Sequence, residues 1–298
     1  MLPTAEGPLQ VFLLHWNEPE GCARAVRGFL GQTVPIRLTV IDNGSLPEKR
    51  KALDLALPNG VERLDLSANL GWGGGLNAGL RRWLGERMGS IAVVAAHDAL
   101  PEPSCLAMLQ EAMMRDGRLG VVSPEYGEPM VPKYGPILGA RILSAVPRKR
   151  GFVEAVDYVH GALMAFRREC LEEIGLFDER YFAYGDEVEI TLRARKAGWK
   201  AAIVWGAIVV NPASGTPKPI LTYLWARSGL LMAETYGSRW RAWVRAGLML
   251  LHNGRLALEQ RGSAGRALRH ARLLAIRDYW QGRFGSPPFE ELTQGDGR

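Results

Sequence analysis

The sequence predicts an α/β protein with a mostly parallel sheet flanked by helices and a helical extension at its C-terminal end. Over about the first two hundred residues, short apolar runs alternate with helical stretches of roughly 10–15 residues, the pattern of βαβ units. Beyond Thr222 the composition changes to arginine, leucine, tryptophan and alanine, with helical character. We therefore expect an α/β domain over residues 1–220 and a basic helical extension over residues 221–298.

The elements of the first domain follow from this alternation in chain order. The apolar runs predict strands at 11–14, 36–41, 61–66, 91–96, 120–123, 156–166 and 201–210. The segments between them predict helices at 19–30, 47–57, 74–88, 103–115 and from 186 to about 197. Residues 124–150 are rich in glycine and proline and have little periodicity, so we expect a loop on the substrate side of the domain.

Length and composition are those of an ordinary soluble globular protein. The 298 residues are 47% apolar and 23% charged. The three cysteines, Cys22, Cys105 and Cys170, lie far apart and predict neither a disulfide framework nor a metal site, which suits a reducing cytoplasm. The first residues lack a signal-peptide pattern, and no apolar window of roughly eighteen residues exists. We therefore expect a cytoplasmic protein.

The positive charge is concentrated in the C-terminal extension. Residues 237–283 hold ten arginines and two acidic residues, a net charge of 10 − 2 = +8, against +6 for the whole chain. This concentration argues against nucleic acid as a partner of the whole protein. Trp240, Trp243, Val244, Leu248 and Leu251 follow helical spacing among these arginines. Such a helix binds an anionic membrane surface peripherally, here at the inner face, or packs on the first domain with its arginines in solvent.

Three carboxylates cluster at the start of one predicted helix. Asp186, Glu187 and Glu189 follow Gly185, and Gly198 closes the segment, as glycines do at helix ends. Negative charge is favoured at a helix start, so N-terminal capping is one interpretation. The other is a general base at the floor of a cleft.

In a parallel sheet, ligands bind beyond the carboxyl ends of the strands. That rule selects His15-Trp16-Asn17 after the first strand and Asp42-Asn43-Gly44-Ser45 after the second. Asp42 opens an Asn-Gly-Ser turn, so simple turn chemistry accounts for it. At this edge it could equally accept a hydrogen bond from a nucleobase imide or a ribose hydroxyl.

The most glycine-rich segment, residues 69–79, leads into a predicted helix. It is neither a GxGxxG fingerprint nor a P-loop, which argues against a dehydrogenase or an ATP-binding protein. Glycines let backbone approach a ligand closely, and a following helix start favours phosphate. A tight connection between strand and helix is the alternative. The candidate ligand-binding residues here are Asn69, Gly71, Trp72, Gly73 and Asn77.

His97 and Asp98 directly follow the predicted strand 91–96. A carboxylate there could hold Mg²⁺ or Mn²⁺ against a diphosphate, since hard cations share oxygen ligands with phosphates. A turn before Pro101 explains Asp98 equally well. For His97, a packing role is somewhat favoured over a ligand role.

Further motifs complete an ordered series. Its members are Trp16-Asn17, Val40-Ile-Asp-Asn-Gly-Ser45, Asn69-Leu-Gly-Trp-Gly-Gly-Gly-Leu-Asn-Ala-Gly79, Asp98 followed by Pro-Glu-Pro, Val159-His-Gly-Ala162, Ile174-Gly-Leu-Phe-Asp-Glu-Arg-Tyr-Phe182, the Asp-Glu-Val-Glu helix and Arg193-Ala-Arg-Lys-Ala-Gly-Trp199. Over about residues 9–236 this series resembles family 2 glycosyltransferases of the GT-A fold, and most closely the bacterial rhamnosyltransferase-like branch.

The resemblance implies roles for individual residues. Asp42 would contact the nucleotide base, and the 69–77 loop would line the nucleoside and diphosphate pocket. Asp98 would be the last carboxylate of the metal-binding triplet, and Gly161 and Ala162 would border the transferred sugar. Glu187 is the first choice for the general base, with Asp186 next. Residues 223–227 would close the acceptor side.

Three departures from the family pattern stand out. The triplet here is Ala96-His97-Asp98, without an acidic or amide first member, so a divalent cation would depend on Asp98, His97, water and the diphosphate. The carboxylate pair is inverted, with the longer Glu187 in the base position. After the last strand, residues 210–212 contain no histidine that could serve as a further ligand.

The resemblance implies inverting transfer of a sugar from a nucleotide-diphosphate sugar to an acceptor hydroxyl. A rhamnosyl donor and cell-surface glycan, glycolipid or secondary-metabolite products are expectations from likeness. The altered triplet leaves a second hypothesis, a catalytically silent nucleotide-sugar binding protein. A nucleotidyltransferase would need a basic loop after the first strand, where Trp16-Asn17-Glu18 stands instead.

Overall fold

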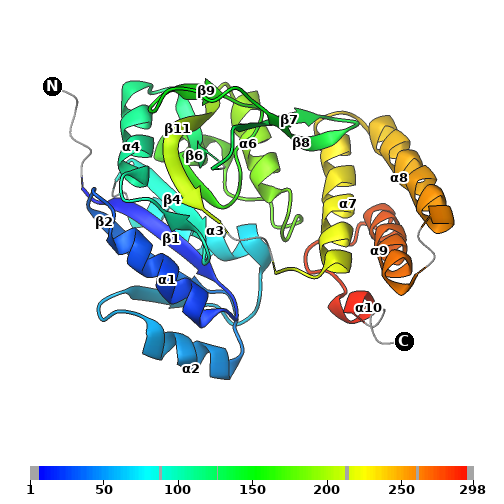
Figure 1. Ribbon diagram of the computed structural model, residues 1–298, viewed down its shortest axis with the longest axis horizontal. Coiled ribbons are helices and arrows are strands. Elements are labelled where there is room, and N and C mark those ends of the chain that lie inside the picture. The colour runs from blue at the N-terminus through cyan, green and yellow to red at the C-terminus, as the bar shows by residue number, and fades with distance from the viewer. Residues whose placement is uncertain (1–6, 87–88, 126, 212–214, 260–261, 294–298) are drawn as a thin grey trace.

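The computed structural model describes residues 7–86, 89–125, 127–211, 215–259 and 262–293. Within these ranges a large sheet is covered by helices on both faces, and further helices stand together at one end (Figure 1). The strands of the sheet are β1 (Leu9–His15), β2 (Ile36–Asp42), β3 (Glu62–Asp65), β4 (Ile91–Ala96), β5 (Leu100–Pro101), β6 (Leu119–Glu125), β9 (Val153–Ala155), β10 (Leu163–Arg167) and β11 (Lys200–Val210). Their order is β3-β2-β1-β4-β10-β6-β11-β5, with β9 paired to β11.

The helices alternate with these strands in the first part of the chain. They are α1 (Pro19–Leu30), α2 (Pro47–Ala56), α3 (Gly71–Glu86), α4 (Cys105–Arg115), α5 (Arg168–Ile174) and α6 (Asp186–Lys196). The C-terminal helices are α7 (Lys218–Thr235), α8 (Arg239–Glu259), α9 (Ser263–Trp280) and α10 (Phe289–Thr293). The expected alternation of strands and helices is thereby confirmed.

One reversed strand positions the functional edge of the sheet. β1 pairs in parallel with β2 and β4, β2 with β3, and β6 with β11, as expected for βαβ units. β10 runs antiparallel between β4 and β6, with Leu163 opposite Ala95. Because β10 starts where β4 ends, the residues just before β10 lie beside the residues just after β4. Gly161 and Ala162 are thereby brought to the carboxyl edge of the parallel strands.

The sheet is apolar because both of its faces are covered. On one face, side chains of β1 and β4 pack with Val26 and Phe29 of α1 and with Leu106 of α4. On the other face, Leu80 of α3 and Ile190 of α6 pack against the alternate residues of the same strands. Burial on both faces explains the continuous apolar runs of the parallel strands.

Residues 124–150 differ from the loop that we expect from sequence. They include a hairpin of β7 (Met130–Gly135) and β8 (Gly139–Ser144), which forms a separate two-stranded sheet. Gly139, with φ +77, lets the chain turn back at the start of β8. The pattern of apolar residues does not indicate this hairpin, because both strands are short and neither has a continuous buried face. Tyr126 lies outside the described residues.

Two other predicted elements have different bounds. The strand expected at 156–166 starts only at Leu163, preceded by the short β9. α3 begins at Gly71, three residues before the predicted start, so the glycine-rich segment forms its first turns. Helical backbone with adjacent glycines is unfavourable by propensity, which explains the later predicted start.

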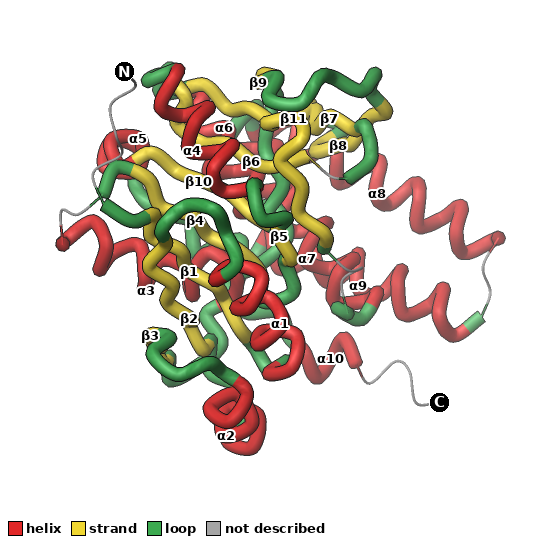
Figure 2. Tube along the Cα trace, turned by 60° about the vertical axis from the view of Figure 1, so that its left-hand side comes forward, coloured by secondary structure: helices red, strands yellow, loops and turns green. Residues whose placement is uncertain are grey.

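The C-terminal helices pack on the α/β domain through α7. Leu230 and Leu231 of α7 share a cluster with Val188 and Leu192 of α6, and α8 and α9 pack on α7 (Figure 2). α7 begins at Lys218, and the division of the chain at residue 220 stays a prediction. In the described ranges, no helix is long and apolar enough to cross a membrane.

Candidate active site

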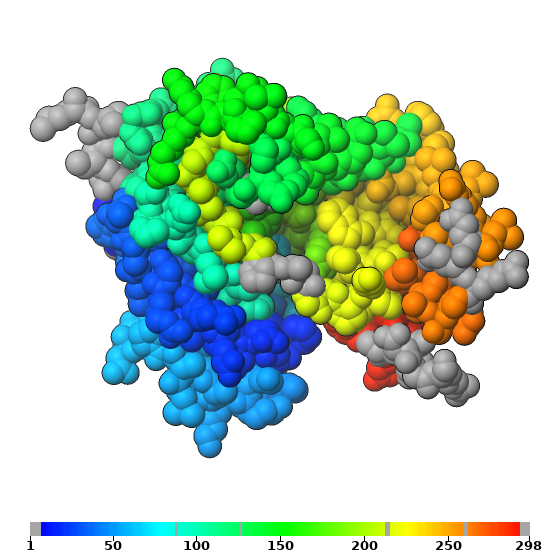
Figure 3. All heavy atoms as spheres, in the orientation of Figure 1, coloured from blue at the N-terminus to red at the C-terminus, as the bar shows by residue number. Residues whose placement is uncertain are grey.

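The candidate site lies at the carboxyl edge of the parallel strands. The backbone N–H of Ala96, at the end of β4, donates a hydrogen bond of 3.0 Å to the carbonyl oxygen of Ala162. Gly161 lies against Glu187, since a methyl group placed on Gly161 would be 3.4 Å from the Glu187 Cβ. The ends of β4, β10 and α6 therefore meet. The molecular surface is hollowed between the N-terminal half of the sheet and α7 (Figure 3).

Asp186 is the buried member of the carboxylate pair. Its Oδ2 accepts a hydrogen bond of 2.9 Å from the N–H of Gly73, at the start of α3. Its Oδ1 is buried without a hydrogen-bond partner among the described residues. Burial, and after it the negative charge of Glu187, raises the pKa of Asp186 well above its usual range. Asp186 is therefore suited to hold a proton rather than to take one from a substrate.

Glu187 is the partly exposed member of the pair. Its Oε2 accepts a hydrogen bond of 2.9 Å from the N–H of Gly185, which orients the carboxylate at the helix start. Its side chain lies along Gly161, which has no side chain to cover it. Of the two carboxylates, Glu187 is therefore the one that a substrate hydroxyl can reach.

The backbone that leads into α6 is strained. Phe182 and Tyr184 have φ values of +66 and +62, and Gly185 follows with φ +124. Left-handed backbone is uncommon for bulky residues and is retained where the surroundings fix it. Here the N–H of Trp72 donates a hydrogen bond of 2.5 Å to the carbonyl oxygen of Phe182. Asn17 (φ +59), the remaining non-glycine residue with positive φ in the described ranges, also belongs to the predicted site.

The third carboxylate, Glu189, has a structural role. It accepts hydrogen bonds of 3.1 and 2.8 Å from the guanidinium of Arg193 and one of 2.8 Å from the hydroxyl of Tyr236. Arg193 also donates to the carbonyl oxygens of Ile174 and Leu176. Glu189 thus ties α6 to α7 and to the loop after α5, and it is buried away from solvent.

Asp42 is fully buried, with an exposed fraction of 0%. Its Oδ1 is 3.1 Å from Nδ1 of His15, and its Oδ2 accepts a hydrogen bond of 2.8 Å from Nε of Arg50. Burial alone would raise the pKa of Asp42, but hydrogen bonds from Ser45, His15 and Arg50 outweigh it and hold the pKa below its usual range. In this conformation the carboxylate presents no surface to a nucleobase, and base contact stays a prediction.

The sequence points to His15 only by its place at the end of the first strand, and it gives no signal for Arg50. Nε2 of His15 accepts the N–H of Glu18 at 3.1 Å, so its proton is on Nδ1 and points to Asp42. Burial lowers the pKa of His15, and the hydrogen bond to Asp42 only partly offsets it. Arg50 lies on α2, and no sequence signal links it to Asp42.

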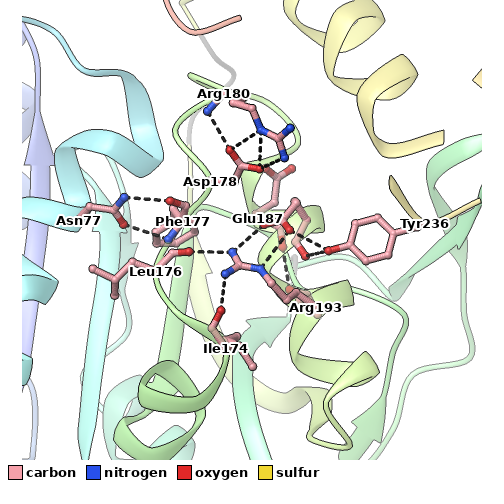
Figure 4. Close-up of polar contacts among 11 residues, drawn as sticks. Asn77, Ile174, Leu176, Phe177, Asp178, Arg180, Glu187, Arg193 and Tyr236 are labelled. Carbon is pink, nitrogen blue, oxygen red and sulfur yellow. Dashed lines mark hydrogen bonds and ion pairs between the residues drawn. The ribbon is translucent and has the colours of Figure 1, made fainter. Parts of the chain in front are cut away.

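Asn43 and Asn77 hold the glycine-rich segment in place. Nδ2 of Asn43 donates to Oδ1 of Asn69 and to the carbonyl oxygen of Gly71, each at 3.0 Å. Asn77 exchanges hydrogen bonds of 2.9 and 3.0 Å with the backbone of Phe177 (Figure 4). Both asparagines are buried, so they position backbone that surrounds the site.

The glycines of this segment make close contacts within the protein. A Cβ on Gly71 would be 2.1 Å from the carbonyl oxygen of Phe182, and one on Gly73 would be 2.6 Å from Cβ of Phe177. On Gly75 and Gly79 it would meet side chains of β1 and β2. Tight packing, the alternative left open by the sequence, accounts for these glycines. Their contact with a ligand stays a prediction.

Asp98 and His97 lie in the turn after β4. Asp98 is partly exposed and forms no hydrogen bond or ion pair with the rest of the described chain. The His97 ring is edge-on to His15, 5.9 Å between centroids, and lies beside Gly21 of α1. No group of three or more His, Cys, Asp or Glu that could hold a metal exists among the described residues. Metal binding by either residue is untested.

The segment 223–227 divides into two roles. Tyr223 and Arg227 are buried and hydrogen-bonded to each other, and Tyr223 donates a further bond of 2.8 Å to Asp278 of α9. They join the C-terminal helices to one another. Trp225 is partly exposed and lies 6.1 Å, between ring centroids, from Tyr184. Only Trp225 in this segment is therefore positioned to meet a ligand beside α6.

Solved structures support the fold. The chain superposes on a mannosyltransferase from Pyrobaculum calidifontis, solved in complex with GDP-Man and Mn²⁺, with a TM-score of 0.57 at 18% identity. The match covers 94% of this chain and 89% of that one. The expected α/β fold of GT-A type with a C-terminal helical extension is confirmed.

Sequence comparisons identify relatives. The chain is 27% identical over 271 residues to an N-acetylglucosaminyl-diphospho-decaprenol L-rhamnosyltransferase from Mycobacterium tuberculosis, covering 80% of this chain and 86% of the relative. It is 26% identical over 165 residues to a low-salt glycan biosynthesis hexosyltransferase from Haloferax volcanii, covering 53% and 52% of the two chains. The expected resemblance to the rhamnosyltransferase-like branch is thereby confirmed.

Family models place the chain directly. One described as "Glycosyltransferase like family 2" matches residues 145–228, and one described as "Glycosyl transferase family 2" matches residues 11–175, which is more than half of the 298 residues. Together these matches span the candidate site from β1 to α7. The chain therefore belongs to glycosyltransferase family 2 and is an enzyme that transfers a sugar from a nucleotide sugar.

Proposed function

We propose that the enzyme transfers its sugar to an acceptor hydroxyl with inversion at the anomeric carbon, and that Glu187 is the general base. The observation that carries this proposal is the contrast within the carboxylate pair. Asp186 is buried and has a raised pKa, whereas Glu187 is partly exposed and lies along Gly161. A general base must reach the proton that it removes, and only Glu187 meets that condition.

The chemistry requires one base and no covalent intermediate. Glu187 takes the proton of the acceptor hydroxyl while the hydroxyl oxygen attacks the anomeric carbon from the face opposite the diphosphate. The bond to the diphosphate breaks as the new glycosidic bond forms, so the configuration inverts. Asp186, hydrogen-bonded to Gly73, fixes the start of α6 and thereby the position of Glu187.

The residues that we assign to donor binding fall into two groups by their exposure to solvent. We propose that the partly exposed Asn17, Asn69, Trp72, Gly161 and Ala162 contact the nucleotide sugar. The buried residues shape the pocket by holding its backbone in place. They are Asp42, Asn43, Gly71, Gly73 and Asn77. This division supports a pocket between the glycine-rich segment and the start of β10.

A divalent cation, Mg²⁺ or Mn²⁺, is part of the proposal. Asp98 fits the role of ligand because its carboxylate is partly exposed and has no other partner in the described chain. The described residues alone supply too few ligands for a cation, so the diphosphate and water would complete its coordination. His97 is the next candidate for a protein ligand. When bound, such a cation offsets the charge that develops on the leaving diphosphate.

The acceptor and donor are proposed from the relatives. The 27% identity to the M. tuberculosis enzyme supports rhamnosyl transfer to a hydroxyl of a lipid-linked sugar, in the synthesis of a cell-surface glycan or glycolipid. A lipid-linked acceptor implies work at the inner, cytoplasmic surface of a membrane, with peripheral contact. A soluble acceptor, as in secondary-metabolite synthesis, would require no such contact.

A silent nucleotide-sugar binding protein is the second candidate. The observation that favours it is the shortage of protein ligands around Asp98. It would bind a donor without turning it over. Catalysis and binding therefore have to be measured separately.

The experiment is a titration of the full chain against UDP, dTDP and GDP sugars, with and without Mg²⁺ or Mn²⁺, scoring binding and donor hydrolysis. We expect metal-dependent binding of one donor, with slow hydrolysis that Glu187→Gln removes while binding persists. Binding without hydrolysis would favour the silent binding protein, and hydrolysis that survives Glu187→Gln would contradict the assigned base. Failure of every nucleotide sugar to bind would contradict the donor pocket.

A further inference from the structure

α8 carries an apolar surface on its outer side. We define the α8 outer face as Trp240, Trp243, Val244, Leu248, Leu251 and Leu258. Every one of these side chains is exposed, with Trp243 at 60%, Leu251 at 72% and Leu258 at 75%. Their spacing places them on one side of the helix, over about five turns.

The opposite side of α8 faces the protein. Ala242, Ala246 and Asn253 are buried there, and Nδ2 of Asn253 donates a hydrogen bond of 3.1 Å to the backbone of α9. Met249 also packs inward, and the Trp243 ring stacks on Trp280 of α9, 3.9 Å between ring centroids. The six residues of the outer face nevertheless stay exposed, whereas a surface helix normally turns its large apolar residues toward the core. The ribbon and the tube view both place α8 at the outer edge of the molecule (Figures 1 and 2).

Arginines flank the outer face. Arg239 and Arg255 are exposed along α8, and the guanidinium of Arg241 lies 5.5 Å from the centre of the Trp240 ring. Residues 237–283 contain two acidic residues, Glu259 and Asp278, and Asp278 is buried. The charged side chains that the structure describes along α8 are therefore all arginines.

We propose that the α8 outer face docks on the surface of an anionic lipid bilayer. An apolar stripe with tryptophans and flanking arginines matches a bilayer interface, where the apolar groups enter the acyl boundary and the cations meet lipid phosphates. The charge is what favours a bilayer over a second copy of this chain, because two such faces brought together would juxtapose their arginines. As α8 does not qualify to span a membrane, it lies in the plane of the surface.

The docking face is connected to the catalytic helix. α7 packs on α8, and Ser228 of α7 stands beside Gly185, since a Cβ on Gly185 would be 3.0 Å from the Ser228 Cβ. A bilayer on α8 would therefore hold Glu187 at a fixed position relative to the lipid surface. This part of the inference rests on the proposed function, because only a lipid-linked acceptor gives the position a purpose.

The test is vesicle flotation with the full chain. Vesicles of phosphatidylcholine alone are compared with vesicles that also contain phosphatidylglycerol, at low and high salt. We expect binding to the anionic vesicles that weakens with salt. The double variant Leu251→Glu/Leu258→Glu should lower this binding by at least about tenfold, because it puts charge at the most exposed apolar positions.

Two further variants keep the result interpretable. Leu55→Glu on α2, where Leu55 is 82% exposed, is the matched control and should bind vesicles as the wild type does. Arg239→Gln/Arg241→Gln should reduce binding to anionic vesicles only and weaken its salt dependence. Thermal melting of each variant tests whether the fold is retained.

Several results would overturn the proposal. They are no binding of the wild type to anionic vesicles, equal binding of the double variant, or lipid-free self-association that the double variant abolishes, which would make a second copy the occupant. Donor binding, measured on the same protein without vesicles, reports separately on the proposed function.

Discussion

The N–H of Gly73 donates a hydrogen bond of 2.9 Å to Oδ2 of Asp186, across 113 positions of sequence. The bond joins the first turn of α3 to the first residue of α6. It commits one oxygen of Asp186 to the protein, and burial denies the other to solvent. The inverted order of the pair, Asp before Glu, thus leaves the longer side chain free beside Gly161.

This division of labour predicts different kinetics for the two carboxylates. Glu187→Gln should lower kcat about 10²–10⁴-fold, the usual contribution of a positioned base, with donor binding nearly unchanged. Asp186→Asn should retain more activity, because asparagine still accepts the Gly73 N–H. Glu48→Gln, on the exposed side of α2 and away from the site, is the control and should leave kcat unchanged. Steady-state kinetics with the identified donor decide, and a larger loss in Asp186→Asn would reverse the assignment.

The raised pKa of Asp186 predicts a pH-dependent effect on stability. Its folded-state pKa lies above the unfolded value, so its contribution to stability is fully present below the unfolded pKa, about 3.9, and is lost as pH rises through the folded pKa. Each pKa unit of difference corresponds to about 1.4 kcal/mol. Asp186→Asn should therefore be more stable than the wild type at pH 8, with a gain that disappears toward pH 4.

Denaturant unfolding of both proteins across this pH range is the measurement. Glu187→Gln serves as a comparison, because removing the neighbouring charge should lower the pKa of Asp186 and flatten the same pH dependence. A difference between Asp186→Asn and the wild type that does not vary with pH would show that Asp186 is already ionised at neutral pH.

The packing around Gly71 leaves no room for a side chain. Gly71 has φ +79, and a Cβ would be 2.1 Å from the carbonyl oxygen of Phe182, which is backbone and cannot give way cheaply. Gly71→Ala should destabilise the protein by more than about 2 kcal/mol and weaken donor binding, because it separates the start of α3 from the strained segment before α6.

Gly85→Ala is the matched substitution on the same helix. No described atom outside the local helix backbone lies within 4 Å of the place that a Cβ on Gly85 would take, so alanine should be neutral or stabilise by up to about 1 kcal/mol. Thermal melts and donor titrations of the pair separate the effect of the contact from that of helix propensity. Equal behaviour of the two variants would refute the packing role of Gly71.

The sequence predicts the βαβ order and the position of the carboxylate pair, because both depend on local pattern. It does not predict that Asp42 is covered, since His15 and Arg50 come from other elements and reach it only in the folded chain. The glycines of α3 are ambiguous from sequence for a different reason. Close approach of a ligand and close approach of Phe182 both require the absence of a Cβ, and only the structure distinguishes them.

We expect His160, next to the candidate site, to make the folded protein less stable in acid. His160 is buried, its Nε2 donates a hydrogen bond of 2.8 Å to the carbonyl oxygen of Pro124, and burial lowers its pKa from 6.5 to about 4. Because the folded-state pKa is depressed, its contribution is present above pH 6.5 and is lost as pH falls toward 4. The loss of stability amounts to about 3 kcal/mol, at about 1.4 kcal/mol per pKa unit.

His160→Gln keeps an N–H donor but cannot titrate, so its stability should depend less steeply on pH than that of the wild type. Urea unfolding between pH 7 and pH 4 measures it, with His252→Gln on the exposed part of α8 as the control that should follow the wild type. If His160→Gln also follows the wild type, the acid sensitivity of the protein originates elsewhere and His160 is not held neutral by its burial.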